Sequence, residues 1–120
     1  MKICVTAIKP SLEAPVDPHF GRCNYFLMVD PVTMDFKYIN NRHVSASGGA
    51  GVQAAQETIG EGIDVLITGS VGPNAYSLLS SENVTIKSFC SGSVREAIEA
   101  YRSGSLENID AANSPGKHGL

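Results

Sequence analysis

The 120-residue sequence contains no tryptophan, no hydrophobic run of 18 residues and no excess of positive charge. Without a long apolar run, no transmembrane helix is expected. The net charge of −3 argues against the broad basic surface that nucleic-acid-binding proteins use. We therefore expect neither a membrane nor a nucleic acid as partner, and any anionic ligand must be held by a few local groups.

Cysteine is also scarce. Cys4, Cys23 and Cys90 are odd in number and widely separated, which is typical of free thiols in a reducing compartment. The sequence has no Cys-x-x-Cys pair and no closely spaced histidines, so a closed structural zinc site is not supported. Met1 and Lys2 lead directly into a strand pattern and not into a signal peptide. These features predict a cytoplasmic protein.

The composition, 42% hydrophobic and 18% charged, is that of a single domain with a packed core. We expect this domain to cover residues 1–106 and to be a monomer. Residues 107–120 contain few apolar side chains, so a flexible C-terminal tail is expected there.

Hydrophobic periodicity predicts three strands followed by alternating helices and strands. The third helix should begin at Ser93, because Ser93 and Glu96 have the spacing of a capping box. This order predicts an α/β fold of three layers, with a mixed five-stranded sheet and helices on both faces. The first strand is apolar throughout, which predicts a central position. The strands are expected at residues 3–8, 25–29, 36–39, 65–68 and 84–89, and the helices at about 52–59, from 73 and from 93.

The chain is organised around a glycine-rich stretch, in which Gly48, Gly49 and Gly51 run into a segment with helical spacing. Glycine lets the backbone approach a ligand, and the first amides of a helix favour an anion. A tight turn that only allows close packing is the alternative. Residues 49–54 match a dinucleotide-binding fingerprint, but no acidic residue ends a second strand about 20 residues later. A phosphate-binding P-loop is excluded because no Gly-Lys-Ser or Gly-Lys-Thr follows.

The carboxyl ends of parallel strands meet at one edge, where ligands of such sheets bind. We therefore expect four loops to converge there: those after the first, fourth and fifth strands, and the loop before the first helix. The loop after the first strand is long and contains Pro10, Pro15 and Pro18, which exclude a continued strand. It leads into residues 19–23.

Several motifs, in this order and spacing, resemble the dinitrogenase iron-molybdenum cofactor biosynthesis family over residues 2–106. They are Asp17-Pro18-His19-Phe20-Gly21-Arg22, Gly48-Gly49-Ala50-Gly51, Gly72-Pro73-Asn74-Ala75, and Val94-Arg95-Glu96-Ala97 with Gly104-Ser105-Leu106. Within the family, the proline-bearing loop and Gly21-Arg22-Cys23 are most similar to the orange-protein branch, whose members carry a molybdenum-copper sulfide cluster.

The resemblance implies a ribonuclease-H-like fold and a carrier or scaffold for metal-sulfur clusters of the Mo-Cu, Fe-Mo or Fe-S type, which recombinant protein can lack. On this resemblance the protein is expected to be a carrier and not an enzyme. Nucleases of that fold need several carboxylates, one of them on the first strand. Here the first strand offers Cys4 and Thr6 instead.

A thiometallate is a sulfur-coated anion, so the implied site needs hydrogen-bond donors and cations. Backbone amides of the glycine stretch form an anion nest, Arg22 is the leading cation, and Phe20 is a candidate apolar wall. Lys9 and Arg42 are weaker cation candidates. His19 and Cys23 are candidate metal ligands, since imidazole and thiolate suit copper and iron. The predicted cluster-binding residues are His19, Phe20, Gly21, Arg22, Gly48, Gly49, Ala50, Gly51, Gly72, Pro73 and Asn74.

Each candidate ligand also has a structural interpretation. His19 can be a hydrogen-bonding residue at a loop exit, and Cys23 a small core residue. Cys4 is expected in the core, whereas Cys90 can face the site. As a whole, the chain can instead bind a phosphorylated small molecule, or act as a regulatory interaction module. For the latter, the resemblance suggests a cytoplasmic ATPase of the septum-positioning type as partner.

Overall fold

The computed structural model describes residues 1–42 and 49–113. These residues form a mixed α/β fold in which helices and strands alternate after an initial hairpin. The elements are β1 (Ile3–Ala7), β2 (Tyr25–Val29), β3 (Phe36–Asn40), α1 (Ala50–Gly60), β4 (Val65–Thr68), α2 (Pro73–Ser81), β5 (Thr85–Ser88), α3 (Val94–Arg102) and β6 (Glu107–Asn108). The predicted order of strands and helices is confirmed as far as α3.

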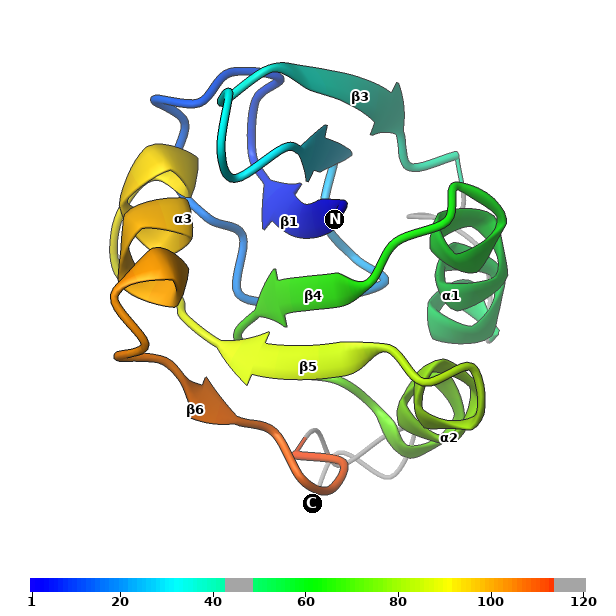
Figure 1. Cartoon of the computed structure of the whole chain (residues 1–120). Helices are drawn as coiled ribbons and strands as arrows, with labels where there is room; N and C mark the ends of the chain where they lie inside the picture. Colours follow the sequence, from blue (N-terminus) through cyan, green and yellow to red (C-terminus); the bar gives the residue numbers. More distant parts are fainter. Residues whose placement is uncertain (43–48, 114–120) are drawn as a thin grey trace.

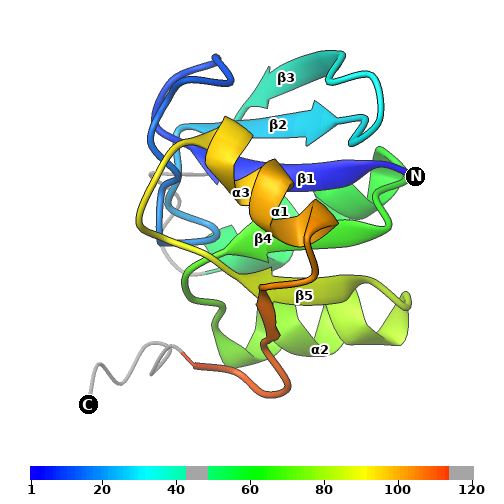
Figure 2. The same ribbon diagram turned by 60° about the vertical axis from the view of Figure 1, so that its left-hand side comes forward.

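The strands form one sheet in the order β3-β2-β1-β4-β5-β6 (Figure 1). β1 pairs antiparallel with β2 and parallel with β4, so it lies inside the sheet, as its unbroken apolar run predicts. β2 and β3 form the expected antiparallel hairpin, and β5 runs parallel to β4. The carboxyl ends of β1, β4 and β5 therefore share one edge, which lies at the left in Figure 2.

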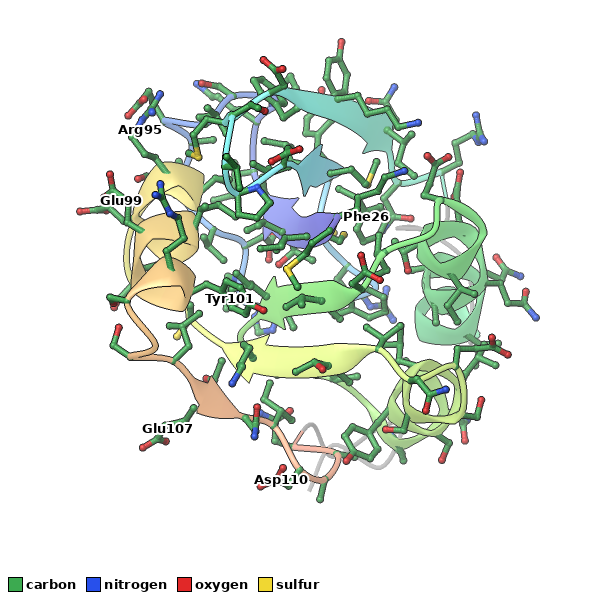
Figure 3. All side chains as sticks on the ribbon, viewed as in Figure 1. Phe26, Arg95, Glu99, Tyr101, Glu107 and Asp110 are labelled. Carbon is green, nitrogen blue, oxygen red and sulfur yellow. The ribbon has the colours of Figure 1, made fainter. Side chains whose placement is uncertain are left out.

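Helices cover both faces of this sheet. α1 and α2 lie on one face and α3 on the other (Figure 2), because alternate residues of β1 point to opposite sides: Cys4 to the first face, Ile3 and Val5 to the second. In Figure 3, Phe26 lies on the α1 side of the sheet, while Arg95 and Glu99 of α3 point outward. The helical residues of the two cores are Ala54, Ala55, Ala75 and Leu79 on one face, and Val94, Ala97 and Ile98 on the other.

The prediction of five strands is wrong, because the described chain contains a sixth. β6 pairs antiparallel with β5, with Asn108 opposite Lys87 and Glu107 opposite Ser88. Neither residue of β6 is apolar, so no strand pattern marks it in the sequence. The strand forms because the next residue, Ile109, is only 8% exposed and donates a 2.8 Å hydrogen bond from its N–H to the carbonyl of Ile86.

Element ends differ from the expected ones by one or two residues. β1 ends at Ala7, β3 continues to Asn40, and β5 is shorter by one residue at each end. α1 begins at Ala50, within the glycine stretch itself. Of the helices in the described parts of the chain, none is long and apolar enough to cross a membrane.

Candidate functional site

Two buried threonines join the ends of β1 and β4 at the carboxyl edge of the sheet. The hydroxyl oxygen of Thr6 lies 2.9 Å from that of Thr68 and 2.6 Å from the carbonyl oxygen of Asp17. The N–H of Asp17 in turn donates to the carbonyl of Thr6 at 2.9 Å. The long loop after β1 is therefore attached to the sheet just before its residues 18–22.

The loop after β4 runs alongside this segment. The N–H of Ser70 donates to the carbonyl of Pro18 at 2.7 Å, and the N–H of Phe20 donates to the carbonyl of Ser70 at 3.1 Å. A Cβ at Gly69 would lie 2.7 Å from the same Pro18 carbonyl, so only glycine fits here. The Nδ1 atom of His19 lies 3.4 Å from the Ser70 hydroxyl. The two loops thus place the exposed His19 ring at the edge of the sheet.

Residues 20–22 press against the first turn of α1. A Cβ at Gly21 would lie 3.0 Å from the Cα and 3.3 Å from the nitrogen of Gly51. Gly21 also has φ +92, a conformation that disfavours other residues. The buried side chain of Asn41 holds this turn, because its Nδ2 donates to the carbonyls of Gly21 (3.0 Å) and Cys23 (2.9 Å). The sequence analysis missed Asn41, since nothing in the sequence marks an asparagine after a strand as a tertiary donor.

The first turns of α1 and α2 lie side by side: a Cβ at Gly51 in α1 would be 3.5 Å from the Cβ of Ala75 in α2. Both helices begin after a glycine, Gly49 and Gly72, which has no side chain to cap the helix, and neither first turn contains an acidic residue. α3 differs, because Ser93 and Glu96 form the predicted capping box. The first-turn amides of α1 and α2, with the positive ends of two helix dipoles, therefore favour an anion. We call residues 18–22, 49–51 and 69–74 the cradle.

Nearly all predicted site residues fall within the cradle. His19 and Arg22 are exposed. Phe20, in contrast, is only 7% exposed and belongs to the core, where its ring centroid lies 5.7 Å from that of Phe26. Gly49 is exposed and has φ +70, which favours glycine. Gly49, Ala50 and Gly51 open α1, and Gly72, Pro73 and Asn74 open α2. Gly48 lies outside the described residues.

The cysteines divide into two kinds. Cys4 and Cys23 are fully buried, as predicted for Cys4, and Cys90 is exposed in the loop after β5. Burial, assisted by the carboxylate of Asp17, raises the pKa of Cys23 from 9.0 to about 12. Burial likewise raises the pKa of Cys4 well above its ordinary value. The complete burial of the Cys23 side chain favours a core function over metal ligation.

The loop after β5 also reaches this edge. The N–H of Val16 donates to the carbonyl of Gly92 at 2.9 Å, and Pro15 forms a bridge with Ser93. All four predicted loops are thus represented at the carboxyl edge by described residues.

Charged side chains near the cradle are of both signs. Arg42 pairs with Glu57 of α1 at 3.1 Å, so its charge is largely balanced. The Oδ1 atom of Asp17 accepts the N–H of His19 at 3.0 Å, which places one carboxylate beside the cradle. Within residues 1–42 and 49–113, no group of three His, Cys, Asp or Glu side chains could hold a metal ion. A metal-containing ligand here would depend mainly on hydrogen bonds and charge.

Comparison with known proteins places this geometry in context. The family model described as "Dinitrogenase iron-molybdenum cofactor" matches residues 1–104. A solved structure of the orange protein from Desulfovibrio gigas, in its apo form, is 36% identical with a TM-score of 0.89, covering 93% of this chain and 95% of that one.

Two further relatives are more distant. A Thermotoga protein assigned provisionally as a NifB protein is 28% identical with a TM-score of 0.83, covering 96% of this chain and 98% of that one. An uncharacterised protein of Methanocaldococcus jannaschii is 28% identical over 107 residues, which are 82% of this chain and 91% of the relative. The family match over residues 1–104 includes the β1, α1, β4 and α2 elements that build the cradle.

Proposed function

Because the chain belongs to the dinitrogenase iron-molybdenum cofactor family, we propose that it is a carrier that holds a preformed, anionic metal-sulfur cluster in the cradle. The cluster is the cargo of the protein and not a resident catalytic group. In this proposal the chain is a carrier and not an enzyme. The ribonuclease-H-like fold, the ATPase partner and the monomeric state remain predictions from the sequence.

The observation that carries the proposal is the pair of adjacent helix starts. α1 and α2 bring their first turns together at Gly51 and Ala75, and neither turn contains an acidic residue. A helix start that is not capped by a side chain leaves backbone N–H groups for an external acceptor. The sulfide surface of a thiometallate is such an acceptor, and two dipoles act on it at once.

The side chains of the cradle add charge and one direct ligand. In this proposal the guanidinium of Arg22, which is exposed in the turn next to Gly21, supplies positive charge to the anion. His19 is also exposed, and its imidazole suits copper or iron. Cys23 is fully buried, which supports non-covalent or weakly ligated binding. The family description, which names an iron-molybdenum cofactor, favours a molybdenum-containing sulfide over other clusters.

Titration with tetrathiomolybdate, alone and with Cu(I), tests the proposal. We expect saturable uptake, measured by the visible absorption of the metal sulfide, and weak competition by inorganic phosphate. Comparable binding of phosphate would instead support a site for phosphorylated molecules. Absence of tetrathiomolybdate binding in both arms, together with no molybdenum, copper or iron in protein isolated from its native host, would refute the carrier function.

A further inference from the structure

A segment beyond the family match lies against the cradle. The family model ends at residue 104, whereas residues 107–113, here called the strap, continue along the sheet edge and past α2. The strap is attached at successive points: β6 pairs with β5, Ile109 is buried, and the carbonyl of Asp110 accepts the Tyr76 hydroxyl of α2. Figure 3 shows Glu107 and Asp110 on the outer side of this segment.

The strap ends on the loop after β4 through one residue, Asn113. Its Oδ1 accepts the N–H of Val71 at 2.8 Å, and its Nδ2 donates to the carbonyl of Gly69 at 3.0 Å. Its backbone N–H donates to the carbonyl of Val71 at 3.1 Å. Asn113 thus forms hydrogen bonds with three polar backbone groups of this loop.

The same loop contacts the cradle on its other side. Between Gly69 and Val71, Ser70 exchanges backbone hydrogen bonds with Pro18 and Phe20, which flank His19. Immediately after Val71, Gly72 and Pro73 begin α2. A shift of this loop would therefore move the His19 segment and the first turn of α2 together.

We infer that Asn113 is a positioning residue of the cradle, holding the loop after β4 so that the His19 segment and the α2 amides face one ligand. This inference rests on the proposed function. It assigns to the strap a part in binding that the family match does not include. Asn113 itself touches no ligand in this inference, and its effect passes through Val71 and Gly69.

Three variants of the full chain test it. Asn113→Ala removes both side-chain hydrogen bonds, while Asn113→Asp keeps the acceptor for Val71 and loses the donor to Gly69. Asn108→Ala is the matched control, because Asn108 is an exposed amide on the same strap with no side-chain hydrogen bond to the described residues. The measurements are amide hydrogen exchange in the ligand-free protein, thermal unfolding, and affinity for tetrathiomolybdate.

We expect Asn113→Ala to speed exchange at Val71 and also at Ser70 and Phe20, and to weaken tetrathiomolybdate binding roughly tenfold. Asn113→Asp should keep protection at Val71 but not the full affinity. Asn108→Ala should match the wild type in exchange and affinity. A purely structural residue would change the unfolding temperature without this loss of affinity in a folded variant.

Faster exchange at Val71 alone, or wild-type affinity in Asn113→Ala, would overturn the inference. If the wild type takes up no tetrathiomolybdate with or without Cu(I), and the protein from its native host contains no molybdenum, copper or iron, the proposed function fails. The exchange data at Ser70 and Phe20 then still decide whether Asn113 positions the loop, so the two failures can be told apart.

Discussion

Gly21 lies so close to Gly51 that a Cβ on Gly21 would be 3.0 Å from the Cα of Gly51. The two residues are 30 positions apart in sequence, one in the loop after β1 and the other in the first turn of α1. Their contact brings the turn that carries Arg22 against the amides of α1. The glycine-rich stretch is therefore a packing surface, as one of the two interpretations of the sequence has it. The other interpretation, an anion-binding site, stays a prediction.

Replacing Gly21 by alanine should destabilise the protein and displace the first turn of α1. The substitution forces a residue with a Cβ to φ +92 and brings that Cβ against Gly51. Gly104→Ala is the control, because Gly104 has φ +74 but nothing within 4 Å of the added Cβ. Gly104→Ala should cost about 1 kcal/mol in the free energy of unfolding, and Gly21→Ala roughly twice that or more. Equal losses of unfolding free energy for Gly21→Ala and Gly104→Ala in urea titrations would show that the close contact of Gly21 with Gly51 does not affect stability.

Reversing the charge of Arg22 should weaken tetrathiomolybdate binding in a salt-dependent way. Arg22→Glu removes a charge-assisted donor and adds repulsion, with an expected loss of about ten- to a hundredfold at low salt. Arg22→Lys should retain part of the affinity but lose the forked geometry. The deficit of Arg22→Glu should shrink at high ionic strength. Arg102→Glu, at the far end of α3 on the other face, should leave binding unchanged. An affinity independent of salt and of Arg22 would exclude the guanidinium from the site.

Above pH 9, the stability of the protein should fall as the pH rises. In the folded protein the pKa of Cys23 is raised to about 12, against an ordinary value of 9.0. Between these values the unfolded chain loses the proton and the folded one keeps it, so unfolding becomes easier. The slope for one such thiol approaches about 1.4 kcal/mol per pH unit. Cys23→Ala should flatten the curve between pH 8.5 and 10.5 in denaturant titrations, and Cys90→Ala should not. Parallel curves for Cys23→Ala and the wild type would contradict the burial effect.

Removing all three thiols should leave most of the cluster uptake. Cys4 and Cys23 are fully buried, so we expect them to contribute packing and not metal ligation. A variant with Cys4→Ala, Cys23→Ala and Cys90→Ser should be less stable, because two buried thiol groups are removed from the core. Below its unfolding temperature it should still bind tetrathiomolybdate. Complete loss of binding in the folded variant, as judged by circular dichroism, would mean that a cysteine ligates the metal.

The sequence predicted most of the fold from local patterns. Apolar runs mark β1, β2 and β4, and a capping box marks the start of α3 at Ser93. These signals can be read from the sequence because each depends on side chains only a few residues apart. The order of strands and helices also indicated which loops share the carboxyl edge, since that follows from parallel pairing. The ends of strands were less certain, because ladder pairing with a neighbour decides where a strand stops.

The functions of single site residues were harder to predict. The sequence marks Phe20 and His19 as neighbours in one motif, but the structure buries the first against Phe26 and exposes the second. Cys23 follows the same motif and is buried as well. Adjacent residues in an irregular loop have no fixed periodicity, so burial in such a loop depends on which elements pack over it.

The amino-acid sequence by itself determined the order of the elements up to α3, the central place of β1 and the glycine-rich start of α1, because periodicity, capping and backbone freedom act over a few residues. Only the tertiary structure decided the sixth strand, the contact of Gly21 with Gly51, and the hydrogen bonds of Asn41 and Asn113 to loop backbone. These features pair groups that lie far apart along the chain. A short polar strand or a lone asparagine side chain acquires its partner only when the sheet and helices have brought that partner within hydrogen-bonding distance.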